Sequence, residues 1–166
     1  MLNESKDSFR VSSALQTYHM RKIIVFTDGA SRGNPGSASI GVVFCNEKGQ
    51  SIKQYAEYLG ENITNNEAEY QALIFALKKF KSLFGKELAK NAEIEIRSDS
   101  ELLIKQIRGE YKILEPKIQT LFLTVWNLKI DFKKIKFTII PREKNKEADA
   151  LANQALDDKN RNQGLF

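Results

Sequence analysis

VFTDGASRGNPG, residues 25–36, is the stretch that decides the fold. An apolar run ends in a carboxylate, Asp28, and three glycines follow within eight residues. A charged group at the end of a buried strand is costly unless something positive lies beside it. The glycines do not form a nucleotide-binding loop, because both the Lys-Ser/Thr pair and the G-x-G-x-x-G order are missing. Two interpretations remain open: a turn in which Asp28 and Asn34 bond nearby backbone amides, and a metal site.

The length and composition are those of one domain. The chain has 166 residues, of which 42% are hydrophobic, enough for a single core. Residues 1–20 are polar and serine-rich and are expected to be disordered, the domain is expected over 21–158, and 159–166 are expected to form a flexible tail. Met20 directly precedes the first strand, so it is a candidate functional start. The net charge of +5 favours a polyanionic partner, although lysines on a solvated surface explain it equally well.

Cysteine and hydropathy patterns bear on the cellular setting. Cys45 is the only cysteine, so no intrachain disulfide is possible, and its apolar surroundings predict a buried core residue. No run reaches the ~18 apolar residues of a membrane span, and no secretion signal is recognisable, so we expect a cytoplasmic protein that does not bind membranes. His19, the single histidine, lies in the polar extension.

Periodicity predicts a β-β-β-α-β-α-α-β-α order of elements. The expected strands are 22–27, 38–45, 51–59, 93–97 and 135–140, and the second and third are joined by a hairpin turn at 46–49. The first helix begins at Thr64, which forms a capping box with Glu67, and ends at Gly85. The other expected helices are 98–107, opened by a capping box from Ser98 to Glu101, then 116–130 with Trp126 in the core, and one capped by Asn145.

Four carboxylates stand at the ends of these elements and are flanked by apolar residues: Asp28, Glu69, Asp99 and Asp149. Taken singly, each has an ordinary explanation as a helix cap, a turn former or a partner of a helix dipole. Periodicity does not show whether they meet in space. If they do, their mutual repulsion raises their pKa values unless divalent cations neutralise the cluster. Oxygen ligands of this kind select Mg²⁺ or Mn²⁺ over zinc.

Four motifs make the sequence familiar. They occur in order as DGASRGNPG (28–36), TNNEAEY (64–70), SDS (98–100) and PREKNKEADALAN (141–153). With their order and spacing the chain resembles the type 1 ribonuclease H family over about residues 22–157. The resemblance implies an α/β fold with a five-stranded mixed sheet, in which a three-stranded antiparallel meander is followed by parallel strands and helices cover both faces.

The resemblance also implies an activity. The family's metal-binding catalytic carboxylates match Asp28, Glu69, Asp99 and Asp149. The implied reaction is hydrolysis of the RNA strand of an RNA/DNA hybrid by a monomeric endonuclease, leaving 5′-phosphate and 3′-hydroxyl ends. Two Mg²⁺ or Mn²⁺ ions would activate a water and stabilise the leaving oxygen. On this view Asp28 is a metal ligand, and it is the residue expected to bridge both ions.

Substrate contacts carry over in the same way. Asn34, Asn65 and Asn66 match groups that contact the hybrid backbone and minor groove, where an amide reads both a 2′-hydroxyl and a base-edge acceptor. Thr64 matches a position near a phosphate of the DNA strand. The remaining expected substrate-binding residues are Gly29, whose lack of a side chain lets backbone approach the nucleic acid, Ser100 and Arg142.

The chain also departs from the family pattern. The loop before the last helix, 141–144, has no histidine, and Arg142 either supplies charge in its place or only contacts phosphate or solvent. The basic protrusion is missing, since only GEYKILE (109–115) separates two helices. Glu101 stands where glutamine is common, which puts one minor-groove contact in doubt. Such trimmed forms resemble archaeal and some bacterial members, and modest, salt-sensitive affinity is expected.

Two other functions stay open. A non-catalytic nucleic-acid-binding module would keep the fold without turnover, but the presence of all four acids argues against it. A related nuclease would act on double-stranded RNA or on DNA in transposition, but the paired asparagines after Thr64 favour reading of a hybrid.

Overall fold

The computed structural model describes residues 21–164. The predictions made for residues 1–20, including His19 and Met20, lie outside the described residues, as do the last two residues of the expected tail. Within the described part of the chain, no helix is both long and apolar enough to cross a membrane.

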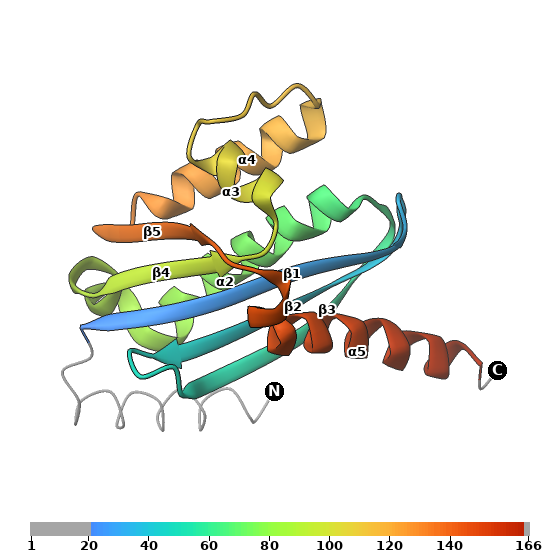
Figure 1. The fold of residues 1–166 in the computed structure, drawn as a ribbon, viewed down its shortest axis with the longest axis horizontal. Coiled ribbons are helices and arrows are strands. Elements are labelled where there is room, and N and C mark those ends of the chain that lie inside the picture. Colours follow the sequence, from blue (N-terminus) through green and yellow to red (C-terminus); the bar gives the residue numbers. More distant parts are fainter. Residues whose placement is uncertain (1–20, 165–166) are drawn as a thin grey trace.

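The five strands form one mixed sheet in the order β3-β2-β1-β4-β5 (Figure 1). β2 is antiparallel to both of its neighbours, β1 and β3, whereas β4 and β5 run parallel to β1. The predicted meander followed by parallel strands is therefore confirmed. The strands are β1 (Lys22–Gly33), β2 (Gly36–Asn46), β3 (Ser51–Ile63), β4 (Glu93–Ser98) and β5 (Lys134–Ile139).

The first hairpin is longer than the sequence predicts, because the pairing of β1 with β2 continues from Ile23 to Gly33. Asp28 therefore lies inside a strand and not at its end, and the chain reverses at Asn34–Pro35, next to Gly33 with φ of +91°. Apolar content marks only the part of a strand that helices cover, so the polar half of this hairpin carries no such signal.

Helices α2 (Asn65–Asn91), α3 (Glu101–Ile107), α4 (Pro116–Lys129) and α5 (Lys146–Gln163) follow the predicted order. The capping box of Thr64 and Glu67 is present. α2 does not end at Gly85, where φ is +83°, but kinks there and continues to Asn91. α3 is capped by Ser100, whose hydroxyl accepts a hydrogen bond from Leu103 N, so the predicted cap at Ser98 is two residues early.

Helices cover both faces of the sheet, as expected (Figure 1). α2, α3 and α4 enclose the main core with one face of β1, β2 and β4, while α5 packs on the other face around Val43 and Ala148. A Cβ atom at Gly41 would lie 2.0 Å from the Ala148 carbonyl oxygen, so only glycine lets α5 approach β2 this closely. Cys45 is buried in this second cluster, as predicted.

One local prediction, the position of Trp126 in the core, is wrong. Trp126 is 46% exposed and packs against Phe122 and beneath the Lys129 ammonium, outside the core. The helical stripe of α4 turns Ile118 and Val125 inward instead. At the other end of the chain, α5 extends to Gln163, so residues 159–163 of the expected tail are helical. A short 3₁₀ helix, η1 (Arg142–Lys144), leads into α5.

Candidate active site

The position of Asp28 follows from the way β1 outruns β4. The parallel pairing of these strands ends at Phe26 and Arg97, after which β1 pairs only with β2. β4 ends at Ser98, and Asp99 begins the turn into α3. Asp28 and Asp99 thus lie close together just beyond the point where the pairing of β1 with β4 ends. The carboxyl end of a parallel strand is a recurrent place for binding sites in α/β folds.

Glu69 reaches the same place because α2 packs unusually close to β1. A Cβ atom at Gly29 would lie 2.3 Å from the carbonyl carbon of Ala68, in the helix backbone. This contact brings Glu69 Oε2 to 3.2 Å from the Gly29 N–H, which donates to it. Gly29 was expected to allow approach of nucleic acid, and the structure shows that it first allows approach of a helix.

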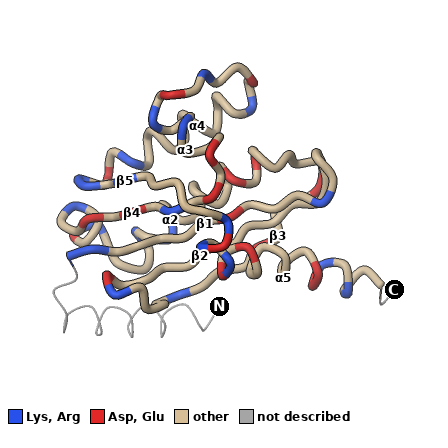
Figure 2. The backbone as a smooth tube through the Cα atoms, in the orientation of Figure 1, with Lys and Arg blue, Asp and Glu red and all other residues tan. Residues whose placement is uncertain are grey.

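Three of the four predicted acids form one cluster. Asp28, Glu69 and Asp99 each offer a carboxylate oxygen, and these oxygens lie within 4.8 Å of one another. Asp149, in the first turn of α5, lines the same cleft, although its oxygens fall outside that group. Figure 2 shows several acidic positions near the middle of the molecule. The cleft has a volume of about 490 Å³, and its lining residues are Asp28, Gly29, Ala30, Ser31, Arg32, Asn65, Asn66, Glu69, Asp99, Ser100, Leu102, Arg142, Asp149 and Asn153.

Burial and mutual repulsion raise the pKa values of two carboxyl groups in this cluster, Asp28 and Glu69. Loss of solvation, followed by repulsion from Asp99 and Asp149, raises the pKa of Asp28 to about 7. Burial, followed by the negative charges of Asp28 and Asp99, raises the pKa of Glu69 well above its usual value. A hydrogen bond between Asp28 and Glu69 lowers the first pKa and raises the second, as expected if Glu69 holds a proton.

Asn145 connects three parts of the site from a position that is 1% exposed. Its Nδ2 donates to the Thr27 carbonyl oxygen and to Asp99 Oδ1, both at 3.0 Å. The backbone oxygen of Asn145 accepts from the Asp149 amide at 3.1 Å. The residue was predicted only as a helix cap, but its side chain makes no capping bond and instead holds Asp99 against β1.

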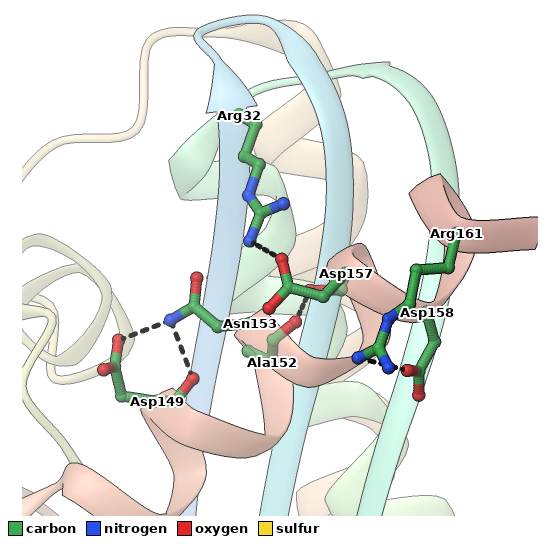
Figure 3. Close-up of polar contacts among 8 residues, drawn as sticks. Arg32, Asp149, Ala152, Asn153, Asp157, Asp158 and Arg161 are labelled. Carbon is green, nitrogen blue, oxygen red and sulfur yellow. Dashed lines mark hydrogen bonds and ion pairs between the residues drawn. The ribbon is translucent and has the colours of Figure 1, made fainter. Parts of the chain in front are cut away.

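α5 adds polar residues that the sequence analysis did not identify (Figure 3). Asn153 Nδ2 donates to the backbone oxygen of Asp149 at 3.0 Å and to its Oδ1 at 3.3 Å. Arg32, which lines the cleft, is held by Asp157 at 2.6 Å. The i, i+4 spacing of Asn153 behind Asp149 was a usable signal, whereas the pairing of Arg32 across 125 residues was not.

The predicted substrate residues divide into two groups. Gly29, Asn65, Asn66, Ser100 and Arg142 line the cleft. Asn34 and Thr64 are not among the lining residues; Asn34 Oδ1 accepts from the Asn65 amide at 3.0 Å, and Thr64 caps α2.

The side-chain oxygen of Asn65 is likewise used within the protein. It accepts from the Ser31 amide at 3.1 Å, and the Ser31 hydroxyl donates to the Ile63 carbonyl oxygen at 2.7 Å. These bonds tie the long β1–β2 hairpin to the start of α2. Asn65 and Asn66 line the same cleft as the carboxyl cluster.

The donor set suits a hard divalent cation. The cluster offers carboxylate oxygens, and among the described residues no histidine or thiol joins it. The raised pKa values of Asp28 and Glu69 mean that Arg142 alone does not neutralise the site. Added positive charge would lower both pKa values, and oxygen ligands favour Mg²⁺ or Mn²⁺.

Comparisons with known proteins agree with this architecture. The family described as "Reverse transcriptase-like" matches residues 26–155. Ribonuclease HI of Halobacterium salinarum is 36% identical over 89% of this chain and 71% of its own length. The crystal structure of LC11-RNase H1 in complex with an RNA/DNA hybrid is 45% identical, with a TM-score of 0.78, over 82% of this chain and 98% of that one.

A longer relative contains the same domain. The bifunctional protein Rv2228c of Mycobacterium tuberculosis is 33% identical over 82% of this chain, which spans 36% of that protein. The structure of its N-terminal RNase H domain is 31% identical, with a TM-score of 0.75, and that comparison covers 98% of the domain. The shared motifs, the sheet topology and the extent of these matches lead to one conclusion: the chain belongs to the ribonuclease HI family.

Proposed function

We propose that this protein is an endonuclease that hydrolyses the RNA strand of RNA/DNA hybrids, with Asp28, Glu69, Asp99 and Asp149 as its catalytic carboxylates. The observation that carries the proposal is the gathering of Asp28, Glu69 and Asp99 within 4.8 Å, in a cleft that Asp149 also lines. Acids separated by up to about 120 residues do not converge by helix capping alone, since capping requires only local contacts.

The same four residues are proposed as the metal ligands, with Mg²⁺ or Mn²⁺ as the ion and two ions bound in the presence of substrate. Bound cations would lower the pKa of the attacking water and offset the charge that develops on the leaving 3′-oxygen. The raised pKa of Asp28, about 7, supports this role, because burial and the nearby charges of Asp99 and Asp149 oppose its ionisation and a bound cation would favour it. Asp28 interacts with both Glu69 and Asp99, and it is the residue that we propose as a ligand of both ions.

The surrounding polar groups suit a nucleic-acid backbone and minor groove. Asn34 and Asn65 use their side-chain oxygens within the protein, so each has its amide NH₂ left to offer a ligand. Minor-groove acceptors on purines and pyrimidines are common to all base pairs. Reading by NH₂ donors would therefore tolerate any sequence. Arg142 is the proposed phosphate contact beside the acids, and the solved complex of the LC11 relative with an RNA/DNA hybrid supports a ligand of this kind.

The two other functions make different predictions. A non-catalytic module would bind hybrid without metal-dependent cutting, and a nuclease for double-stranded RNA would cut that substrate at least as fast. The presence of all four acids in one cleft favours catalysis. We further propose a monomer that works in the cytoplasm, where a single buried thiol such as that of Cys45 stays reduced.

Labelled RNA/DNA hybrid, duplex RNA and duplex DNA, each incubated with Mg²⁺, Mn²⁺ or chelator, provide the test. We expect cleavage of the RNA strand of the hybrid only, with 5′-phosphate ends and complete dependence on added metal. Binding without cleavage in any metal would reject the enzyme, and faster cleavage of duplex RNA would reject the assigned substrate.

A further inference from the structure

A buried group of hydrogen-bonded side chains adjoins Asn66, one of the residues that line the cleft. Gln106, in α3, is 7% exposed, and its Oε1 accepts from the hydroxyl of Tyr70 at 3.0 Å and from Asn66 Nδ2 at 3.4 Å. Its Nε2 donates to the backbone oxygen of Lys112 at 3.5 Å. Tyr70 is fully buried, and Asn66 lines the cleft. The group thus links the core, the connection after α3 and a side chain proposed to contact substrate.

The Lys112 carbonyl gives this group a direction. A backbone carbonyl only accepts hydrogen bonds, so it requires that Gln106 turn its nitrogen toward it. The Gln106 oxygen then faces Tyr70 and Asn66. Because an oxygen needs a donor, Asn66 presents its nitrogen to Gln106 and turns its own oxygen away. The two outer contacts, at 3.4 and 3.5 Å, are weaker than the 3.0 Å bond from Tyr70, and together the three contacts fix the orientation of both carboxamides.

The orientation of Asn66 is imposed on it. Its Oδ1 is shielded from solvent and has no donor within the described part of the chain. A buried acceptor without a partner costs about 1–3 kcal/mol. Among the described residues, the contact with Gln106 is the one hydrogen bond that limits rotation of the Asn66 carboxamide. Gln106 opposes that rotation, and Tyr70 holds Gln106 in turn.

We propose that Gln106 is a positioning residue for substrate binding: it holds the Asn66 carboxamide with its shielded Oδ1 turned away, so that the NH₂ is the group offered to the hybrid. The inference rests on the proposed function and deepens it, because it assigns to a residue outside the cleft lining a part in holding the substrate. Gln106 is not among the residues that line the cleft, so it acts through Asn66. Its effect belongs in KM and hybrid affinity, because the carboxyl cluster does not include it.

The test compares Gln106→Met, which keeps the length of the side chain but removes its hydrogen bonds, with Asn66→Ala and the double variant. For Gln106→Met we expect KM for a hybrid to rise roughly three- to tenfold, as for one lost hydrogen bond, with kcat changed less than twofold. In the Asn66→Ala background, Gln106→Met should raise KM no further, since the group that it positions is gone.

Gln119→Leu is the matched control. The Gln119 side chain also donates to a backbone oxygen of the same connection, that of Ile113 at 3.0 Å, but forms no hydrogen bond with Tyr70 or Asn66. We expect its KM to match that of the unaltered protein. Melting temperatures show whether each variant folds, and Gln106→Leu replaces Gln106→Met if the latter does not.

An unchanged KM in Gln106→Met would overturn the proposal. So would effects of Gln106→Met and Asn66→Ala on KM that multiply in the double variant, because they would show that the two side chains act independently. Failure of the proposed function has a different signature. In that case the unaltered protein does not cut hybrid at all, while its hybrid affinity without metal can still be compared among the same four variants.

Discussion

Asp28 is the residue on which the site depends, since it contacts or repels each of the other acids. Asp28→Asn keeps the shape of the side chain and removes its charge. We expect a folded protein whose rate of hybrid cleavage falls at least about a hundredfold, because one ligand of the proposed metal site is lost. Initial rates with Mg²⁺ and circular dichroism measure the two parts of this prediction. A rate close to that of the unaltered protein would remove Asp28 from the catalytic set.

The same residue predicts a pH dependence of stability. Its pKa is raised from 3.8 to about 7 in the folded protein, so between these values the folded state binds a proton that the unfolded state does not. The free energy of unfolding contributed by Asp28 therefore falls as pH rises from about 4 to about 7, and Glu69 acts in the same direction. In chelator, melting temperatures should decrease over this range, less so for Asp28→Asn, and added Mg²⁺ should reverse the decrease at pH 8. A melting temperature in chelator that rises from pH 5 to 8 would contradict the assignment.

Asn145 tests whether the acids need support from behind. Asn145→Ala removes the donor to Asp99 and Thr27, and leaves buried acceptors without a partner. The loss should destabilise the protein by about 1–3 kcal/mol. It should also reduce kcat, with a smaller change in KM, because Asp99 keeps its charge but loses its position. Urea unfolding and steady-state kinetics give the two values. Asn127→Ala, at an exposed position on α4, is the control. Equal effects of the two substitutions would contradict the supporting role of Asn145.

At the scale of elements, the close contact between β1 and α2 builds the cluster. Gly29→Ala places a methyl group 2.3 Å from the backbone of Ala68, so α2 must move away from β1. We expect both lower stability and weaker cleavage, because Glu69 moves with the helix. Overpacking of this kind costs roughly 1–3 kcal/mol. Gly164→Ala, where the new atom meets nothing closer than 3.7 Å, should change neither the melting temperature nor the rate, and a silent Gly29→Ala would show that α2 can shift freely.

The sequence predicted elements where a local rule decides them. The apolar runs located all five strands, and the Thr64–Glu67 capping box located the start of α2, because alternation and capping act within a few residues. The polar half of the β1–β2 hairpin was missed, since its pairing depends on the partner strand and not on apolar content. The kink at Gly85 was taken for a helix end because the residues beyond it pack against the rest of the fold, which the local pattern does not reveal.

The site was predictable in kind but not in connectivity. The motifs named four acids, and the structure brings Asp28, Glu69 and Asp99 together. The side-chain role of Asn145 was hidden because a helix-cap position already explained the residue. The group formed by Tyr70, Gln106 and Asn66 spans two helices and a backbone carbonyl, and no spacing rule connects them.

At the scale of the whole molecule, the chain carries a net charge of +5, whereas its cleft is lined by four acids and two arginines, Arg32 and Arg142. Attraction to a polyanion must therefore come from basic groups, while the acids are suited to bind cations. This division separates binding, which salt weakens, from catalysis, which metal restores. The short connection between α3 and α4 adds few basic residues that could bind the hybrid, so each basic side chain at the cleft contributes a large share of the affinity.

Arg142 and Arg161 test this division. Arg142 lines the cleft, whereas Arg161 pairs with Asp158 on α5 and does not line it (Figure 3). The logarithm of hybrid affinity should fall linearly with the logarithm of salt concentration, and Arg142→Ala should reduce the slope by about one and weaken binding equally for hybrids of different sequence. Arg161→Ala removes the same charge from the molecule and should leave the slope unchanged. Fluorescence anisotropy in chelator, from about 50 to 200 mM salt, measures the slope without cleavage. Equal slopes for the two variants would mean that net charge alone attracts the hybrid, and that Arg142 makes no phosphate contact.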